Sequence, residues 1–314
     1  MKFRALVSSY LLVAACAGTV CAGPQQPTAP PQQPERPLPL TASELELYKH
    51  AQTLIDWSPR QVRDCPFLHK LRPAESQAQL PTVLDRVGQT SILLFHDFPQ
   101  ISCDEEVVSE VYSRRYHITP HHKFHYIVIP RPVDDLPAFE EYRTDLKGNP
   151  PDTLSLRDLF LLTSKFTSTW LYLSPADQPC NRFRHFGTQT IRNRECQVVG
   201  FAQEPQKARR VCRFLIGSNS AVLLLQGLAW IDSETFQVLR METWLLAPRA
   251  DISLGSQIST VDFYPVQPTG SERMFWLPRD VTVEMVYRGV PVRNTHHYSN
   301  FKLFRVESTI KPVG

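Results

Sequence analysis

Histidines are the residues of this sequence whose type and spacing most resemble a chemical site. Four lie within nine residues, at positions 117, 121, 122 and 125, and two more are adjacent at 296 and 297. Imidazole serves metal sites and acid–base catalysis. Pro120 and the alternation after it place the first group on a turn and a strand, with the charge of Lys123 between His121 and His125. A solvent-facing hairpin end therefore explains them better than a metal site, and the same holds for His296 and His297.

Motifs of catalysis and cofactor binding are missing from the sequence. It contains no GxSxG, GxxxxGK[ST], HExxH or GxGxxG pattern, so we predict neither an enzyme nor a bound cofactor. A hydrolase without a motif would need a buried histidine within hydrogen-bond reach of a carboxylate and a hydroxyl.

The first 22 residues predict export. Lys2 and Arg4 precede an apolar run of signal-peptide length, and Val20-Cys21-Ala22 fits a signal peptidase site. A lipobox ending at Cys16 is the alternative, in which Cys16 would carry a lipid anchor. The protein is then periplasmic or secreted, or an outer-membrane lipoprotein. Seven prolines between residues 24 and 39 make 23–40 a semi-rigid spacer.

Five cysteines remain after residue 22, at 65, 103, 180, 196 and 212, and none has the CxxC spacing of a zinc ribbon. In an oxidising compartment Cys65 and Cys103, which bracket a predicted helix, are expected to form a disulfide. Cys180 pairs more easily with Cys212 than with Cys196, because a hairpin turn at Asn193 places Cys196 opposite Thr190. The pairing of the last three stays open.

Arginines are concentrated between residues 182 and 213, where eight basic residues stand against two acidic ones. Guanidinium groups suit phosphate oxygens, so this stretch could contact an anionic envelope surface, although a solvated hairpin face is the simpler explanation. The arginines concerned are Arg182, Arg184, Arg192, Arg194, Arg209 and Arg210. The net charge of the whole chain, +3, indicates no nucleic-acid partner.

The 314 residues divide into early helices and late strands. Thr41 and Glu44 form a capping-box pattern that opens a helix to about Trp57, and a second helix begins near Pro81. A weaker pattern predicts a third helix over 154–170. Alternation predicts strands over 123–129 and 281–287, a hairpin around Arg192-Asn193-Arg194, one buried strand over 221–231 and a β-bulge near Leu303. Hence we predict an α+β fold with a helical lid region over 41–104 and an antiparallel β domain over 105–314.

Several short stretches resemble a group of secreted, uncharacterised acidobacterial proteins over about residues 80–308. They include Leu225–Asp232, Gln237–Met241, Leu245–Arg249, Trp276–Arg279 and His297–Phe301. More distantly, this order of strands is similar to Lol-type lipoprotein carriers. That resemblance implies an unclosed half-barrel of roughly nine or ten strands, with helices covering a concave apolar face that receives acyl chains. The cysteines, the spacer and the basic hairpin depart from that pattern.

Two functions therefore compete. One is a non-enzymatic extracytoplasmic protein that binds a lipid or other apolar ligand between sheet and helices. The other is a structural or interaction module of the cell envelope whose core is filled by its own side chains. A ligand cavity would be lined by inward positions of the late strands, among them Trp244, Phe263, Val283 and Met285, and would measure several hundred Å³.

Overall fold

The computed structural model describes residues 40–112, 117–118, 121–133, 136–149, 166–216 and 219–304. The predicted signal peptide, Cys16, nearly all of the Pro-rich spacer and most of the helix predicted over 154–170 lie outside these residues. Within the described ranges, no helix combines the length and apolar character needed to cross a membrane.

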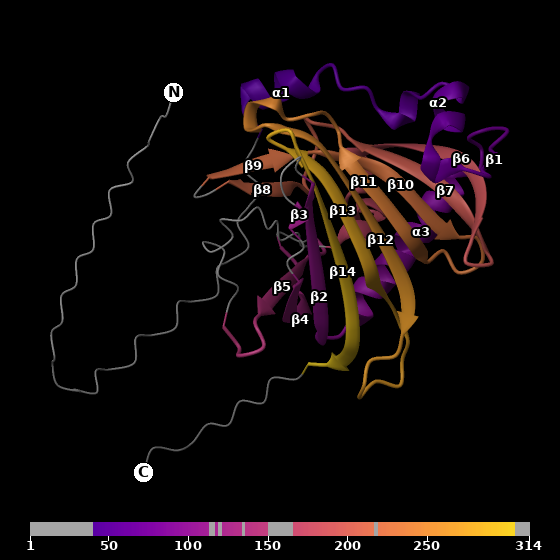
Figure 1. Ribbon diagram of the computed structural model, residues 1–314. Helices are drawn as coiled ribbons and strands as arrows, with labels where there is room; N and C mark the ends of the chain where they lie inside the picture. Colours follow the sequence, from indigo (N-terminus) through magenta and orange to yellow (C-terminus); the bar gives the residue numbers. More distant parts are fainter. Residues whose placement is uncertain are drawn as a thin grey trace, which may run out of the picture. The chain divides into compact units, whose positions relative to one another are not determined.

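A large antiparallel sheet dominates the described chain (Figure 1). Its strands run in the order β1, β6, β7, β10, β11, β12, β13, β14, β2, β4, β5, with β3 paired to β2. The bounds are β1 Arg72–Pro73, β2 Ile101–Tyr112, β3 His117–Ile118, β4 His121–Pro130, β5 Phe139–Thr144, β6 Asn181–Ile191, β7 Arg194–Gln203, β10 Leu225–Asp232, β11 Val238–Leu245, β12 Leu254–Val266, β13 Phe275–Tyr287 and β14 Val290–Leu303. The two ends, β1 and β5, do not pair with each other, so the sheet is unclosed as expected.

The structure corrects the sequence prediction in two respects, the number of strands and the continuity of the strand predicted over residues 221–231. The sheet has 12 strands rather than nine or ten, and a separate two-stranded sheet pairs β8 Cys212–Ile216 with β9 Asn219–Leu223. Residues 221–231 are not one strand: the run breaks at Leu224, which lies between β9 and β10. An unbroken apolar run does not show where the chain leaves one sheet for another, and the two-residue strands β1 and β3 have no periodicity to detect.

One face of the sheet packs against α3 Leu80–Asp97 and the 3-10 helix η4 Thr169–Leu173. The second helix therefore starts as predicted, with Pro81 in its first turn and Val87 and Ser91 buried. The sheet contributes buried residues to this interface, among them Phe201, Val261, Val283 and Met285. This interface holds the largest hydrophobic core of the described residues.

The opposite face, over β6, β7, β10 and β11, packs under residues 40–73, here called the strap (Figure 1). The strap contains α1 Ala42–Tyr48, η1 Leu54–Asp56, α2 Pro59–Asp64 and η2 Pro66–Leu68. Its helices thus lie on the face opposite to α3, so the expected single lid of N-terminal helices is wrong. Both faces of β10 are covered, which explains why its residues up to Ile231 are apolar except Gln226.

The first helix is shorter than predicted. The capping box is present, because Thr41 Oγ1 accepts from the Glu44 amide and the Glu44 carboxylate accepts from the Thr41 amide. The helix nevertheless ends at Tyr48 instead of Trp57. The chain then follows the sheet surface, where Leu54 donates its amide hydrogen to Gln226 at 2.8 Å, so packing replaces helical hydrogen bonds.

The hairpin and the β-bulge are each slightly displaced from the predicted position. Arg192 and Asn193 form the turn with φ of 49° and 62°, the left-handed pair of a two-residue hairpin loop. Cys196 therefore faces Gln189, one residue from the predicted Thr190. In β14 the register shifts between Ser299 and Lys302, where Asn300 has a φ of 54°, rather than at Leu303.

The predicted Cys65–Cys103 disulfide is wrong, and Cys180, whose pairing the sequence left open, forms no disulfide either. The thiols of Cys65, Cys103 and Cys180 are free. Cys65 packs in the cluster under the strap and Cys103 in the core under α3, so the sheet lies between them. Cys180 lies at the base of the hairpin, where its carbonyl accepts from Glu204, whereas Cys212 begins the separate β8–β9 sheet.

Candidate functional site

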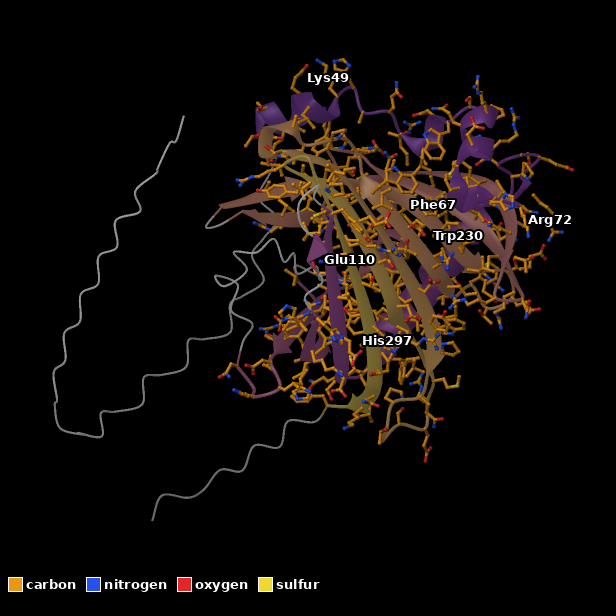
Figure 2. All side chains as sticks on the ribbon, in the orientation of Figure 1. Lys49, Phe67, Arg72, Glu110, Trp230 and His297 are labelled. Atoms are coloured by element: carbon orange, nitrogen blue, oxygen red, sulfur yellow. The ribbon has the colours of Figure 1, made fainter. Side chains whose placement is uncertain are left out.

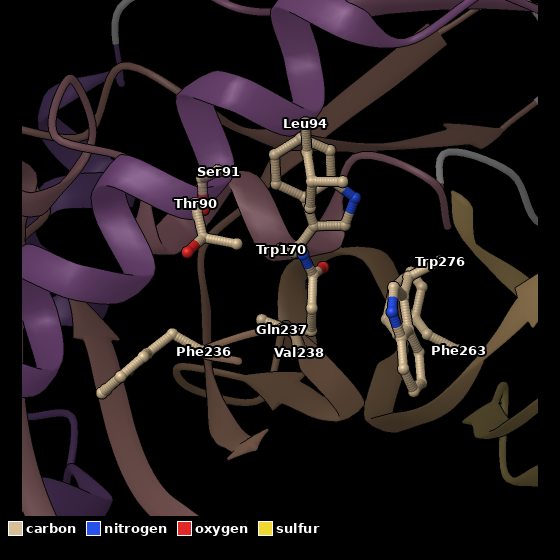
Figure 3. A pocket seen from close by; sticks show the side chains of 9 residues that line it. All are labelled: Thr90, Ser91, Leu94, Trp170, Phe236, Gln237, Val238, Phe263 and Trp276. Carbon is tan, nitrogen blue, oxygen red and sulfur yellow. The ribbon is translucent and has the colours of Figure 1, made fainter. Parts of the chain in front are cut away.

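The space between α3 and the sheet, where a ligand cavity was expected, is filled by side chains. A void at this interface is lined by Ser91, Leu94, Trp170 and Phe263, among others, and holds about 10 Å³ (Figure 3). That is about the space of one water molecule. Of the expected lining residues, Phe263 borders this void, while Val283 and Met285 are 1% and 4% exposed and belong to the packed core.

A much larger groove lies on the other face, between the strap and strands β10 to β12. Its volume is about 920 Å³, near the upper end of the range of ligand pockets in proteins, roughly 300–1,000 Å³. Residues 47–67 of the strap form one wall, and Gln226, residues 244–248 and residues 255–258 form the other. Trp244, the fourth expected lining residue, belongs to this groove.

Three aromatic side chains form the apolar surface of the groove. Trp57 and Trp244 stack with ring centroids 6.0 Å apart and planes 16° apart, and Phe67 stacks on Trp244 at 6.4 Å and 19°. Phe67 lies beneath α2 on the sheet side of the strap (Figure 2). Trp57 follows η1, Phe67 belongs to η2 and Trp244 to β11, so the strap and the sheet build the surface jointly.

Gln226 is the polar residue at the bottom of the groove, and it is 5% exposed. Its Oε1 accepts from the Leu54 amide at 2.8 Å. Its Nε2 has two long contacts, 3.5 Å to the Gln52 carbonyl and 3.4 Å to the Leu245 carbonyl. One end of the amide therefore fixes the strap, and the other end retains donor capacity.

Sheet side chains hold the strap mainly by its backbone. Arg184 donates to the carbonyls of Ile55 and Trp57, at 3.2 and 2.6 Å, and Gln189 donates to those of Phe67 and His69. These contacts lie on either side of α2. In α2 itself no described residue is buried. The strap is thus anchored at both ends of α2 and open between them.

The arginines predicted to contact an anionic surface have partners within the protein. Arg182 binds Asp56 through both terminal nitrogens, and Arg194 binds Asp232. Arg192 donates to the carbonyls of Leu239 and Phe263, and Arg210 binds Asp177. Arg209 is exposed. Contact with an anionic surface stays a prediction, but most of these guanidinium groups also support the fold.

The histidines occupy two different environments. His121, His125 and His297 are on the exposed face of β4 and β14, each beside a carboxylate: Glu106 at 3.8 Å, Asp104 at 3.2 Å and Asp280 at 2.7 Å respectively. Figure 2 shows His297 on β14. Among the described residues, no group of three or more His, Cys, Asp or Glu side chains is placed to hold a metal ion.

His296, in contrast, is buried in a polar cluster on the α3 face. Its Nδ1 is 2.8 Å from Glu105 Oε1, an oxygen that also accepts from the Tyr298 hydroxyl at 2.8 Å. Arg143 donates to both oxygens of Glu105. Burial acts to raise the pKa of Glu105, but the hydrogen bonds from Arg143 and His296 outweigh it and lower that pKa to about 2.

This cluster contains the histidine, carboxylate and hydroxyl that a motif-free hydrolase would need, but in another arrangement. The Tyr298 hydroxyl donates to Glu105 and is not presented to His296 as a nucleophile. Glu105 accepts four hydrogen bonds, so buried donors of the protein already occupy both of its carboxylate oxygens. Such saturation is typical of a structural ion cluster.

Sequence reasoning missed Trp57, Phe67 and Gln226. Gln226 had a signal, because it is the one polar residue in the apolar run of residues 221–231. Trp57 and Phe67 had none, since they flank a short helix whose position over β11 follows from tertiary contacts.

Comparisons with known proteins give fold likeness without a family. No family model matches the chain, and no curated protein matches it. Among solved structures, it is similar to a DUF1329 family protein from Desulfovibrio piger, with 11% identity, a TM-score of 0.39, and coverage of 73% of this chain and 94% of the other. A LolA superfamily protein from Nitrosomonas europaea is 10% identical, with a TM-score of 0.33, and the match covers 72% of this chain and 94% of the other. A domain from Vibrio parahaemolyticus, described as an outer membrane lipoprotein-sorting protein, is 10% identical, with a TM-score of 0.36. The match covers 70% of this chain and 91% of the other.

One of these neighbours is described by the LolA name, and another as a lipoprotein-sorting protein domain. All three TM-scores are below 0.5, so the likeness says nothing about what this chain binds. The resemblance to acidobacterial proteins stays a prediction.

Proposed function

We propose that this protein is a non-enzymatic, extracytoplasmic binding protein that holds an apolar, chain-like ligand in the groove between the strap and the sheet. The observation that carries the proposal is the groove itself, about 920 Å³ in volume and lined by the stacked rings of Trp57, Trp244 and Phe67. A protein that needed only a core would fill such a space, because protein interiors are close-packed.

The mechanism is burial of apolar surface. An extended hydrocarbon chain lying along the three rings loses contact with water at about 25 cal/mol per Å² of apolar area. Entry is through the open side of α2, which contributes no described buried residue. The export signal predicted in the first 22 residues would place this activity outside the cytoplasm.

The competing function, a structural module, has support in the packed interface under α3. It does not account for the groove on the other face. The two functions differ in one measurable property, namely whether a chain-like ligand reaches Trp57 and Trp244.

Quenching of tryptophan fluorescence by a fatty-acyl methyl ester brominated along its chain tests the proposal. We expect saturable quenching, and Trp244→Ala should weaken binding about tenfold, which corresponds to the loss of roughly 55 Å² of apolar contact. Trp276→Phe is the matched control, because Trp276 borders the small void beside α3. Absence of saturable quenching, or equal weakening by both substitutions, would contradict the proposal.

A further inference from the structure

We propose that the ligand of this groove is an uncharged fatty-acyl ester whose carbonyl oxygen accepts a hydrogen bond from Gln226 Nε2. This inference rests on the proposed function and adds the chemical class of the ligand. It follows from the hydrogen-bonding state of Gln226, the charges of the groove and the orientation of its rings.

Gln226 supplies the polar recognition. Its Oε1 is fully engaged by the Leu54 amide, and this contact fixes which end of the side-chain amide is the donor. Nε2 has two hydrogens, and its contacts of 3.4 and 3.5 Å to the carbonyls of Leu245 and Gln52 are at the outer limit of a hydrogen bond. A carbonyl oxygen in the groove can therefore make a shorter bond than either present partner.

Charge excludes an anionic head group. None of the described residues lining the groove carries the permanent positive charge of lysine or arginine, and His50 and Asp64 are its histidine and its acidic residue. A carboxylate or phosphate brought beside Gln226 would lose its hydration without a compensating cation, which is costly in a largely apolar site. An ester carbonyl carries no such cost.

The ring geometry argues against a cationic head group. Recognition of an ammonium group over aromatic faces requires rings whose faces converge on the cation. Here the planes of Trp57, Trp244 and Phe67 are within 16° and 19° of parallel, so their faces do not converge on one point, and the three rings together form an apolar surface. Such a surface suits a hydrocarbon chain that continues from the carbonyl group at Gln226.

Three probes separate head-group recognition from binding of the chain: monopalmitoylglycerol as the uncharged ester, palmitate as the anion, and the hydrocarbon dye diphenylhexatriene, which has no carbonyl. Gln226→Glu is the informative variant, because it keeps an oxygen to accept from the Leu54 amide and replaces the donor by an acceptor. Binding is measured at pH 8.5, well above the usual range of a glutamate. Gln89→Glu, at an exposed position of α3 outside the groove lining, is the matched control.

Wild-type protein should bind monopalmitoylglycerol at least tenfold more tightly than palmitate. Gln226→Glu should weaken the ester at least tenfold while changing the affinity for diphenylhexatriene less than twofold, and Gln89→Glu should leave the ester affinity within threefold. Equal binding of ester and palmitate, or parallel loss of ester and dye in Gln226→Glu, would overturn the inference and leave the proposed function standing. If neither the dye nor the ester binds wild-type protein, the proposed function fails and this inference with it.

Discussion

Nδ1 of His296 lies 2.8 Å from Oε1 of Glu105, and both side chains are completely buried. The two residues lie on the neighbouring strands β14 and β2, where Glu105 is opposite Tyr298, and Arg143 of β5 completes the cluster from a third part of the chain. Buried charged side chains therefore connect strands β2, β5 and β14, at the end of the sheet that the strap does not cover.

Removing the charge of Glu105 should destabilise the protein strongly. Glu105→Leu would leave the Arg143 guanidinium, whose side chain is 7% exposed, without its carboxylate partner, and loss of one member of a buried ion pair costs roughly 3–5 kcal/mol. Urea denaturation measures the change. The double variant Glu105→Leu/Arg143→Met should recover part of the loss, and a single-variant loss below about 1 kcal/mol would show that the pair is not needed.

Stability should fall as the pH is lowered below about 6.5. Burial lowers the pKa of His296, so the unfolded chain takes up this proton before the folded one does. The pKa of Glu105, about 2, is below its ordinary value of 4.5, so stability from Glu105 is present above pH 4.5 and lost as the pH falls towards 2. Denaturation between pH 7 and pH 3 should show both losses in wild-type protein. His296→Gln should abolish the first, and an unchanged profile in that variant would contradict its assignment to His296.

Glu242 of β11 should give the opposite pH dependence. Burial raises its pKa to about 8, while Thr260 donates a hydrogen bond to it. Between pH 4.5 and 8 the unfolded chain ionises this group and the folded chain does not, so stability from Glu242 falls as the pH rises, by at most about 1.4 kcal/mol per pH unit. Glu242→Gln should remove that slope, whereas Glu284→Gln, at an exposed position of β13, should not.

A methyl group at Gly200 should loosen the strap. A Cβ atom there would lie 2.3 Å from Leu54 Cδ1 and 2.4 Å from Phe186 Cε2, both closer than van der Waals contact allows. Gly200→Ala should cost roughly 1–3 kcal/mol and speed the hydrogen exchange of the Leu54 amide. At Gly255, which lines the groove, the nearest atom would be 3.7 Å away, so Gly255→Ala should change neither quantity.

The thiols of Cys65, Cys103, Cys180 and Cys196 should be free but unreactive in the folded protein. Burial raises the pKa of Cys65, Cys103, Cys180 and Cys196, the last to about 11. Alkylation without reductant should therefore be slow in the native state and complete at all four positions in denaturant. Mass spectrometry gives the count. A melting temperature that drops on adding dithiothreitol would indicate a disulfide and contradict the structure.

Local patterns predicted local structure well. The capping box at Thr41, the turn at Arg192-Asn193 and the alternation of Phe124, Tyr126 and Val128 each depend on neighbouring residues, and each is present. The end of the first helix was not predictable from those neighbours. It depends on Gln226, which is 172 positions from Leu54 in the chain.

The sites were less accessible to sequence reasoning because they combine distant segments. The groove needs residues 47–67, 226, 244–248 and 255–258, and no spacing links them. Trp244 was identified because it occupies an inward-type position on a strand, but its side chain is on the strap face. The ion cluster combines Glu105, Arg143 and His296. The alternation along each strand indicates which positions face inward, but it does not indicate that these three side chains meet.

The way in which the sheet holds the strap has a consequence for how such a protein can change over evolution. Arg184 and Gln189 bind carbonyl oxygens of the strap, and every residue type provides a carbonyl oxygen. Residues 58–66 can therefore be substituted without loss of these anchors. A lineage could acquire a new ligand preference by altering this short segment while the sheet keeps its sequence, so that selectivity and folding are under separate selection.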